Sequence, residues 1–274
     1  MAAPDYLNGG AWFCSHTSPQ AKEITMIRLD SISLTFNKGL AAEVKALDRL
    51  NLEIEAGTFT LVLGANGSGK SSLLNILAGS ILPDSGQINF KNQNITRWPD
   101  YKRSAFIARI FQDPLKGTAP GMSLLENFRL ASLRNNTRGL QTGLNRNFRR
   151  LVAEQVSSLE MGLENRLDQL MGSFSGGQRQ ALSLLMATWC KADLLLMDEP
   201  TAALDPSSAA TVFNLAQKII REKGITCLMV THDLKYCIQA GDRILLFSEG
   251  KVTRDLKGQS KKDLNYNDVA NWFI

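Results

Sequence analysis

The sequence lacks long apolar runs, and it contains few cysteines and histidines. None of its apolar stretches approaches the roughly 20 residues that a helix needs to cross a bilayer, so a membrane-spanning class is excluded. The four cysteines show no metal-ligand spacing, and Cys190 and Cys227 stand in apolar context, where we expect small core residues in a reducing cytosol. The N-terminus has no basic segment followed by an apolar stretch, so it does not resemble a secretory signal.

The composition is that of one globular domain. The chain has 274 residues, of which 44% are hydrophobic and 21% are charged, as in soluble globular proteins. Its net charge of +5 has a local origin, because residues 127–153 contain six arginines and no acid. We expect a solvated face there, with a polar loop around residues 135–139. No recognised nucleic-acid-binding module is visible, so we expect no nucleic-acid partner.

One glycine-rich segment has the pattern of a phosphate-binding loop. Residues 59–63 are predicted to form a buried strand and residues 71–78 a helix, which is the context that this motif requires. Backbone N–H groups of the glycine turns and of the helix start can surround a phosphate chain. Lys70 would reach the β- and γ-phosphates, and the Ser71 hydroxyl would ligate Mg²⁺. The residues predicted to bind the phosphates are Gly64, Ala65, Asn66, Gly67, Ser68, Gly69, Lys70, Ser71 and Ser72.

A second segment places two carboxylates at the end of a predicted strand. Residues 194–197 are apolar and are followed by Asp198 and Glu199, as in a buried parallel strand whose carboxyl end faces a ligand. Asp198 would belong to the Mg²⁺ shell, and Glu199 could orient and deprotonate an attacking water. Alone, this pattern also fits a strand that ends in solvated acids. Together with the phosphate loop, it predicts a nucleotide-hydrolysing site.

The third motif indicates a family. Residues 173–180, with the letters SFSGGQRQ, precede a predicted helix over residues 181–191 and resemble the signature sequence of ATP-binding cassette (ABC) ATPases. A serine and two glycines at a helix start form an anion site. The family usually has Leu where this chain has Phe174, and both side chains can serve as apolar anchors. The resemblance implies that the γ-phosphate held by the phosphate loop of a second subunit is bound by Ser175, Gly176, Gly177 and Gln178.

The other motifs of that family follow in its usual order. Gln112 resembles the Q-loop glutamine that reaches Mg²⁺ and the attacking water, and Asp205 resembles the D-loop aspartate that crosses the dimer interface. His232 follows the predicted strand 225–230 and resembles the switch histidine that contacts the γ-phosphate. Phe36 resembles the aromatic residue that stacks on adenine, which is more often Tyr; Phe keeps the stacking face and loses the hydroxyl. A core position at a strand end is the alternative for Phe36.

The resemblance covers about residues 26–250 and implies the fold, the ligands and the partners. It implies an α/β P-loop NTPase fold of ABC type, with a RecA-like core, an antiparallel β region and a helical subdomain at about residues 115–185. ATP and Mg²⁺ are the implied ligands. The implied partners are a second copy in a head-to-tail dimer and transmembrane permease subunits, at the cytoplasmic face of the inner membrane. Residues 111–120 and 179–188 further resemble bacterial importers that work with a periplasmic binding protein and carry amino-acid-like solutes.

Two other assignments stay open at this point. ATPases of lipid or lipoprotein export have a similar length and plan, and soluble single-cassette ATPases act in iron–sulfur cluster assembly. A neighbouring gene for a multi-span permease would favour transport, and one for a scaffold protein would favour assembly. Because the helical subdomain faces the membrane partner in the family, attraction to anionic lipid head groups is a second interpretation of the basic segment 127–153.

Three further segments carry expectations. Residues 1–25 show no periodicity and are expected to be a disordered extension or the product of a start codon assigned too early; a docking segment that uses Trp12 and Phe13 is the alternative. Residues 251–274 are expected to form a short tail with an apolar stripe that includes Leu264, Val269 and Trp272. Residues 113–128 are expected to form a groove for a short permease helix, lined by several of Leu115, Pro120, Met122, Leu124, Leu125 and Phe128. Leu115 and Met122 are the favoured residues, because they precede the helix, and a core position is the alternative for Leu124, Leu125 and Phe128.

Overall fold

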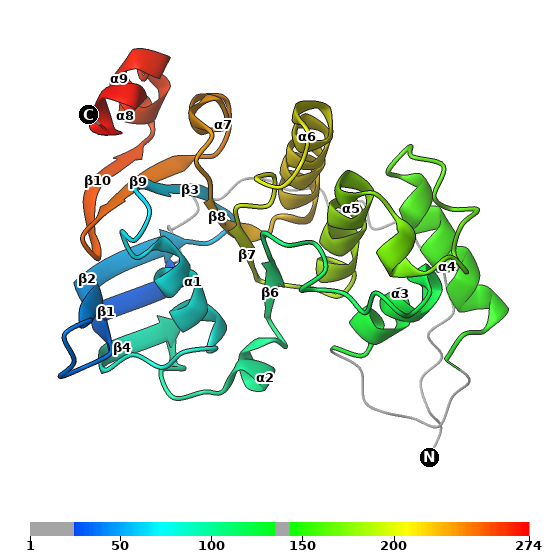
Figure 1. The fold of residues 1–274 in the computed structure, drawn as a ribbon, viewed down its shortest axis with the longest axis horizontal. Helices are drawn as coiled ribbons and strands as arrows, with labels where there is room; N and C mark the ends of the chain where they lie inside the picture. Colours follow the sequence, from blue (N-terminus) through cyan, green and yellow to red (C-terminus); the bar gives the residue numbers. More distant parts are fainter. Residues whose placement is uncertain (1–24, 135–142, 274) are drawn as a thin grey trace, which may run out of the picture.

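The computed structural model describes residues 25–134 and 143–273, and two β-sheets form its framework (Figure 1). The N-terminal extension expected at residues 1–25 lies outside the described residues, except for Thr25, where the first strand begins. Within the described part, no helix is both long and apolar enough to cross a membrane.

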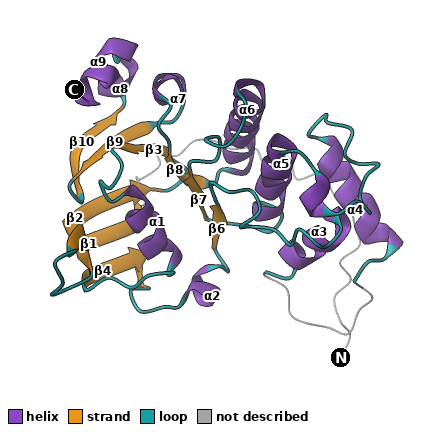
Figure 2. Cartoon of the chain, in the orientation of Figure 1, coloured by secondary structure: helices purple, strands orange, loops and turns teal. Residues whose placement is uncertain are grey.

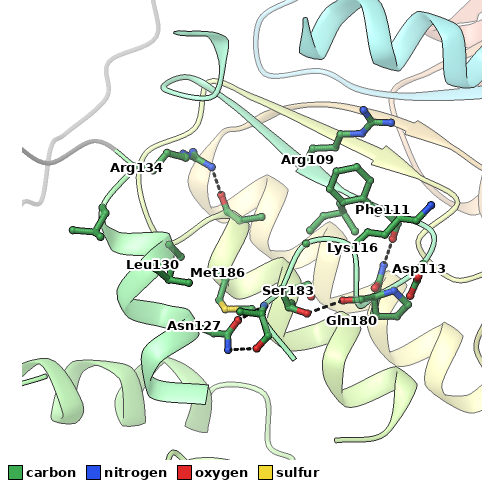
Figure 3. A pocket seen from close by; sticks show the side chains of 18 residues that line it. Arg109, Phe111, Asp113, Lys116, Asn127, Leu130, Arg134, Gln180, Ser183 and Met186 are labelled. Carbon is green, nitrogen blue, oxygen red and sulfur yellow. Dashed lines mark hydrogen bonds between the residues drawn. The ribbon is translucent and has the colours of Figure 1, made fainter. Parts of the chain in front are cut away.

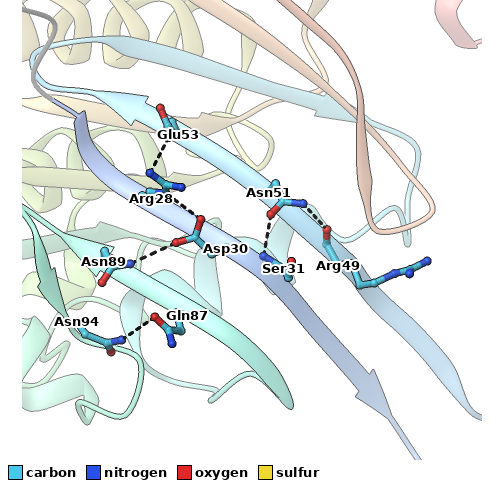
Figure 4. A network of polar contacts seen from close by, with 9 residues as sticks. All are labelled: Arg28, Asp30, Ser31, Arg49, Asn51, Glu53, Gln87, Asn89 and Asn94. Carbon is cyan, nitrogen blue, oxygen red and sulfur yellow. Dashed lines mark hydrogen bonds and ion pairs between the residues drawn. The ribbon is translucent and has the colours of Figure 1, made fainter.

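The smaller sheet is antiparallel and has the strand order β2-β1-β4-β5. Its strands are β1 (Thr25–Phe36), β2 (Val44–Glu55), β4 (Ser85–Phe90) and β5 (Gln93–Asn94). Buried and exposed residues alternate along β1 and β2, so one face packs into the core and the other faces solvent. The solvent face carries a polar network that includes Arg28, Asp30 and Glu53 (Figure 4). This sheet is the antiparallel β region that the family resemblance implies.

The larger sheet has the order β10-β9-β3-β8-β7-β6, and all adjacent pairs except β10 with β9 are parallel. Its strands are β3 (Phe59–Gly64), β6 (Ile107–Ile110), β7 (Leu194–Asp198), β8 (Thr226–Val230), β9 (Arg243–Ser248) and β10 (Lys251–Lys257). Val62, Val230 and Asp198 pair in register across β3, β8 and β7. The carboxyl ends of these three strands therefore meet at one edge, where ligands bind in such sheets.

The parallel strands are buried on both faces because alternate residues enter two apolar cores. One core joins the antiparallel sheet and helix α1 (Lys70–Ala78) to one face of the larger sheet, through residues such as Leu73 and Val62. The other joins the opposite face to helices α5 (Gly176–Ala187) and α6 (Pro206–Lys223), through residues such as Leu61. Cys227 is completely buried, as expected, whereas Cys190 is partly exposed. The helices around the larger sheet are α1 (Lys70–Ala78), α2 (Asp100–Arg103), α6 (Pro206–Lys223) and α7 (Leu234–Gln239).

A helical region lies between β6 and β7 in the chain, to one side of the larger sheet (Figure 2). Its described elements are α3 (Leu124–Ser132), α4 (Arg146–Ser157), the 3₁₀ turn η1 (Met171–Ser173) and α5 (Gly176–Ala187). Trp189, just after α5, packs edge-on against Phe128 of α3 and Phe148 of α4. The region corresponds to the helical subdomain implied at about residues 115–185.

The chain beyond Gly250 differs from the short tail that we expected. β10 pairs antiparallel with β9, so the larger sheet continues past Gly250. The remaining elements are α8 (Gln259–Lys262), α9 (Tyr266–Ala270) and the 3₁₀ turn η2 (Asn271–Phe273). Val269 is completely buried, and the expected apolar partners Leu264 and Trp272 pack against the same core.

One buried arginine ties the last turn of α1 to the segment that leads into β6. Arg103, the last residue of α2, is completely buried. Its guanidinium donates five hydrogen bonds of 2.6–3.1 Å to the carbonyl oxygens of Ile76, Leu77, Ile95, Thr96 and Trp98. Burial lowers the pKa of Arg103 to about 10. The guanidinium thus adds hydrogen bonds to carbonyl groups in the last turn of α1, where Ile76 O also accepts from the N–H of Gly79, the C-cap.

Candidate nucleotide-binding site

The phosphate loop connects β3 to α1, and its geometry requires glycine at two positions. Gly64 and Gly69 have φ angles of 150° and 106°, which residues with a side chain avoid. A Cβ atom at Gly64 would lie 2.3 Å from the Phe247 carbonyl oxygen, and one at Gly69 would lie 2.4 Å from the Ala46 carbonyl oxygen. Residues 65–67 form the exposed tip of the loop. The base of the loop is therefore in close contact with β9 and β2.

Hydrogen-bond donors gather where this loop meets α1. The helix begins at Lys70 without a side-chain cap, which leaves the N–H groups of its first turn available to an anion. Lys70 is buried, and its Nζ donates to the carbonyl oxygens of Gly64 and Ala65 at 2.8 Å each. Burial lowers the pKa of Lys70, and the carboxylates at the end of β7 act in the opposite direction. The Ser68 hydroxyl is buried without a partner in the described part of the chain. This donor set fits a phosphate chain.

Two of the three predicted Mg²⁺ ligands, Ser71 and Asp198, are in contact beside the loop, and the third, Gln112, lines a hollow next to Asp198. Ser71 Oγ donates to Asp198 Oδ1 at 3.3 Å, which links α1 to the end of β7. Gln112 follows β6 and lines the same hollow of about 550 Å³ as Asp198 and Asn75. Hydroxyl, carboxylate and amide oxygens are the ligand atoms that Mg²⁺ prefers, so the residues fit the ion. Ser72, the next predicted residue, is partly exposed in the first turn of α1.

The predicted base and the predicted switch histidine form a close pair at the ends of β7 and β8. Glu199 Oε1 lies 2.5 Å from His232 Nε2, and the Glu199 N–H donates to the Val230 carbonyl oxygen at 3.0 Å. Glu199 has a left-handed φ of 46°, a conformation that costs about 1–3 kcal/mol in residues other than glycine and is found at functional sites. A carboxylate held in this way can accept a proton from a water molecule, with the histidine as its positioning residue.

Arg109 is a residue of this site that sequence analysis did not identify. It lies in β6, is largely buried, and its Nη2 is 3.5 Å from Asp198 Oδ2. Its guanidinium also stacks on the Phe111 ring, 4.7 Å from the centroid. Burial lowers the pKa of Arg109, and the charge of Asp198 raises it. The signal that could have found it is a charged residue in the middle of an apolar strand.

The signature residues form a second site that is separate from the phosphate loop. Ser175 is the N-cap of α5 in a capping box: its Oγ accepts from Gln178 N at 3.3 Å, and Gln178 Oε1 accepts from Ser175 N at 3.1 Å. α5 therefore begins at Gly176 and ends at Ala187, not over residues 181–191 as we predicted. Signature residues share a hollow of about 320 Å³ with the first turn of α6, and no residue of the phosphate loop lines it. Phe174 is buried, as its anchor role requires.

Two other predicted site residues have local structural environments. Asp205 is the N-cap of α6, and its Oδ1 accepts from the N–H groups of Ser207 and Ser208 at 3.1 and 3.0 Å. Hydrogen bonds from Ser208 lower the pKa of Asp205. Its role across a dimer interface stays a prediction. Phe36 is 38% exposed at the end of β1, where it pairs with Val44. The alternative of a core position for Phe36 is therefore wrong, and the ring is available for stacking.

A groove of about 650 Å³ lies next to the Q-loop, between residues 109–119, α3 and α5 (Figure 3). Its position agrees with the expected groove, but its apolar lining does not. Leu124, Leu125 and Phe128 are buried in the core, which is the alternative that we left open for them. The favoured residues Leu115 and Met122 do not line the groove either, so the predicted lining is wrong. The larger apolar side chains that line it are Ile110, Phe111, Leu130, Leu133 and Met186.

Comparisons with known proteins identify the family of this chain. The family model for ABC transporters matches residues 47–202. A tyrosine transport ATP-binding protein of Clostridioides difficile (strain R20291) is 38% identical over 255 residues, which are 90% of this chain and 98% of that protein. An aliphatic sulfonates import ATP-binding protein of Escherichia coli is 34% identical over 215 residues, 78% of this chain and 76% of that protein.

A solved structure supports the same conclusion. The dimeric ATP-binding cassette MJ0796, in a post-hydrolysis state bound to ADP and Pi, superposes with a TM-score of 0.72 at 29% identity, over 85% of this chain and 98% of that chain. The expected ABC-type P-loop fold is thereby confirmed. This chain therefore belongs to the ABC transporter family, as an ATP-hydrolysing nucleotide-binding subunit.

Proposed function

We propose that this chain powers an importer of a small amino-acid-like solute. The observation that carries the proposal is the likeness to a tyrosine transport protein, which extends over 98% of that protein. The sulfonate relative is also named for import. Neither of the two relatives reported above is named for lipid export or for iron–sulfur cluster assembly.

In the proposed mechanism, the chain holds ATP by its phosphates and activates a water molecule. Lys70 and the N–H groups of residues 64–72 would hold the β- and γ-phosphates, and Phe36 would stack on the adenine. Ser71, Asp198 and Gln112 would hold Mg²⁺, which supplies positive charge beside the phosphates. Glu199 would take the proton of the attacking water, and His232, 2.5 Å from it, would position its carboxylate.

The separate hollow of the signature residues supports a dimer as the working form. In a head-to-tail arrangement, the Ser175–Gln178 segment of a second copy would complete each ATP site, with the N–H groups at the start of α5 facing the γ-phosphate. Asp205 would lie at the same interface, because Ser207 and Ser208 of its helix line the signature hollow. The dimeric state of the MJ0796 cassette supports this arrangement.

The groove beside the Q-loop would receive a cytoplasmic segment of a permease at the inner face of the membrane. Arg109, Phe111 and Asp113 line both this groove and the hollow that contains Asp198. Docking and ATP chemistry would therefore share side chains. A periplasmic binding protein would deliver the solute on the other side of the membrane.

A matched pair of substitutions tests the docking surface. Leu130 in the groove and Leu151 on α4 are 49% and 48% exposed, and only Leu130 lines the groove. Leu130→Glu should abolish co-purification of the permease with a tagged chain, whereas Leu151→Glu should retain it. Both variants should keep the wild-type unfolding temperature, because each side chain is half exposed. Equal retention of the permease by both variants would place docking elsewhere.

Reconstitution tests the transport function. The complex of this chain with its permease, in proteoliposomes with the binding protein, should take up labelled tyrosine or a related amino acid only when ATP is present. Uptake should stop when Glu199 is replaced by Gln. A complex that hydrolyses ATP and moves none of the common amino acids would contradict the solute class.

A further inference from the structure

The groove next to the Q-loop is cationic as well as apolar. Arg109, Lys116 and Arg134 line it, together with one acid, Asp113. Arg109 is paired with Asp198, and Asp113 Oδ1 accepts a hydrogen bond from the Leu115 N–H at 2.9 Å. Lys116 and Arg134 form no ion pair within the described ranges 25–134 and 143–273. Among the described residues, the cations of the groove therefore outnumber its acids, and neither Lys116 nor Arg134 is held in an ion pair.

Arg134 is the more constrained of these two cations. Its Nη1 donates to the Ala187 carbonyl oxygen at the end of α5, at 3.1 Å. Its Nε and Nη2 are buried, and neither has a hydrogen-bond partner among the residues that the structure describes. Burial lowers the pKa of Arg134. Unpaired guanidinium N–H groups in a buried place are unfavourable, and residues 127–153 contain no acid that could pair with them locally.

The rest of the groove completes an amphipathic surface. Leu130, Leu133 and Met186 give it apolar area. On α5, the Gln180 Oε1 and Ser183 Oγ atoms are buried and also lack partners in the described part of the chain. Arg134 and Lys116 lie on opposite sides of the view in Figure 3, one at the end of α3 and the other in the loop after β6. A matching ligand would have apolar side chains, polar atoms and negative charge.

We propose that the permease segment that enters this groove is acidic, and that one of its carboxylates pairs with Arg134 while another faces Lys116. The proposal rests on the function proposed above, which makes a permease the occupant. An acidic segment complements the positive charge of the groove, and a carboxylate can accept two parallel hydrogen bonds from a guanidinium. Rotation of the long Arg134 side chain would bring its unpaired N–H groups to the carboxylate. In a site that excludes water, such a charge pair also rejects neutral or basic segments.

A crosslinking experiment tests which group faces Arg134. The complex is purified through a tag on this chain, with Arg134→Lys as the test variant and Arg134→Gln as the control. A carbodiimide joins a lysine amine to a carboxylate with loss of water, so Lys at position 134 should couple to an Asp or Glu in a cytoplasmic segment of the permease. The Gln variant should give no product at that position. Coupling of the Lys variant only to this chain, or to a second copy of it, would overturn the proposal.

Charge reversal gives an independent measurement. Arg134→Glu should weaken binding of the permease at least tenfold, because charge-assisted hydrogen bonds are lost and a like charge is added. Arg146→Glu is the matched control, since Arg146 is exposed at the start of α4, where an acid is tolerated. It should change the affinity less than twofold. The same reversal of the crosslinked permease carboxylate to Lys should restore binding to the Arg134→Glu variant.

The outcomes separate this proposal from the one on which it rests. If Leu130→Glu prevents binding and Arg134→Glu does not, the groove is the docking site but the acidic partner is wrong. If no multi-span membrane protein binds the wild-type chain, the proposed function itself fails. If Arg134→Glu weakens binding to vesicles of anionic phospholipid that contain no protein, and leaves permease binding intact, the groove recognises lipid head groups instead.

Discussion

Replacing Arg103 with Met should destabilise the chain by about 3–5 kcal/mol. The guanidinium is completely buried and donates five hydrogen bonds to backbone carbonyls from two segments. Met has a similar length and no donor, so all five carbonyl groups would lose a partner. Each hydrogen bond to a charged group contributes about 1.5–3 kcal/mol. The net loss is smaller than their sum, because the variant no longer buries a charge and because the site can relax.

Urea unfolding followed by fluorescence measures this effect. The midpoint should fall while the slope of the transition stays constant, since the exposed surface on unfolding is unchanged. Arg103→Lys should lie between the wild type and the Met variant, because an ammonium has three donors for five carbonyls. Arg97→Met is the control: Arg97 is exposed, and the change should stay within about 0.5 kcal/mol. A loss below 1 kcal/mol for Arg103→Met would refute the view that this network anchors the end of the phosphate-loop helix.

Three further predictions follow from the site and its surroundings. Glu199→Gln should still bind ATP and should release phosphate about 10²–10⁴-fold more slowly, because the attacking water loses its base. Size-exclusion chromatography should also show an ATP-bound dimer of this variant, and a wild-type rate would contradict the role of Glu199 as the base. Gly64→Ala should abolish binding of a fluorescent ATP analogue, because the added Cβ atom would lie 2.3 Å from a backbone oxygen. A Cβ atom added at Gly67 would have no other atom within 4 Å, so Gly67→Ala should bind the analogue more weakly but still measurably. Lys45 and Lys251 hold the pKa of Asp48 well below its usual range, so the stabilising contribution of its carboxylate is complete above about pH 5 and is lost progressively as the pH falls towards the lowered pKa. In thermal unfolding between about pH 2 and pH 6, the unfolding temperature of Asp48→Asn should therefore fall less on acidification than that of the wild type.

Features that depend on neighbouring residues could be predicted from the sequence. The strand before the phosphate loop was expected at residues 59–63 and spans Phe59–Gly64, and the helix after it was expected at residues 71–78 and spans Lys70–Ala78. The start of α5 was missed by five residues although its signal is local. Ser175 and Gln178 form a capping box, a pattern that marks the first turn of a helix.

Features that depend on distant parts of the chain could not be predicted in this way. The carbonyl partners of Arg103 lie up to 27 positions away, so no local pattern marks this arginine as buried. The prediction of the residues that line the groove failed for a related reason. Leu124 and Phe128 are four residues apart on the core side of α3, whereas Leu130 lies on its other side and Leu133 follows the helix as its C-cap. The boundary of the helix had to be known before its apolar residues could be assigned to two faces.

The last strand protects the molecule from self-association. β9 is buried along Ile244–Phe247, and β10 supplies the partner for one of its edges. β10 is mostly charged, and Lys251 and Lys257 also reach Asp48 and Glu55 of β2 at 2.9 and 2.7 Å. A chain shortened after Gly250 would expose an apolar strand with unpaired backbone groups, which is a template for pairing between chains. Such a chain should form insoluble aggregates, so the solubility of this ATPase depends on residues that contribute nothing to its chemistry.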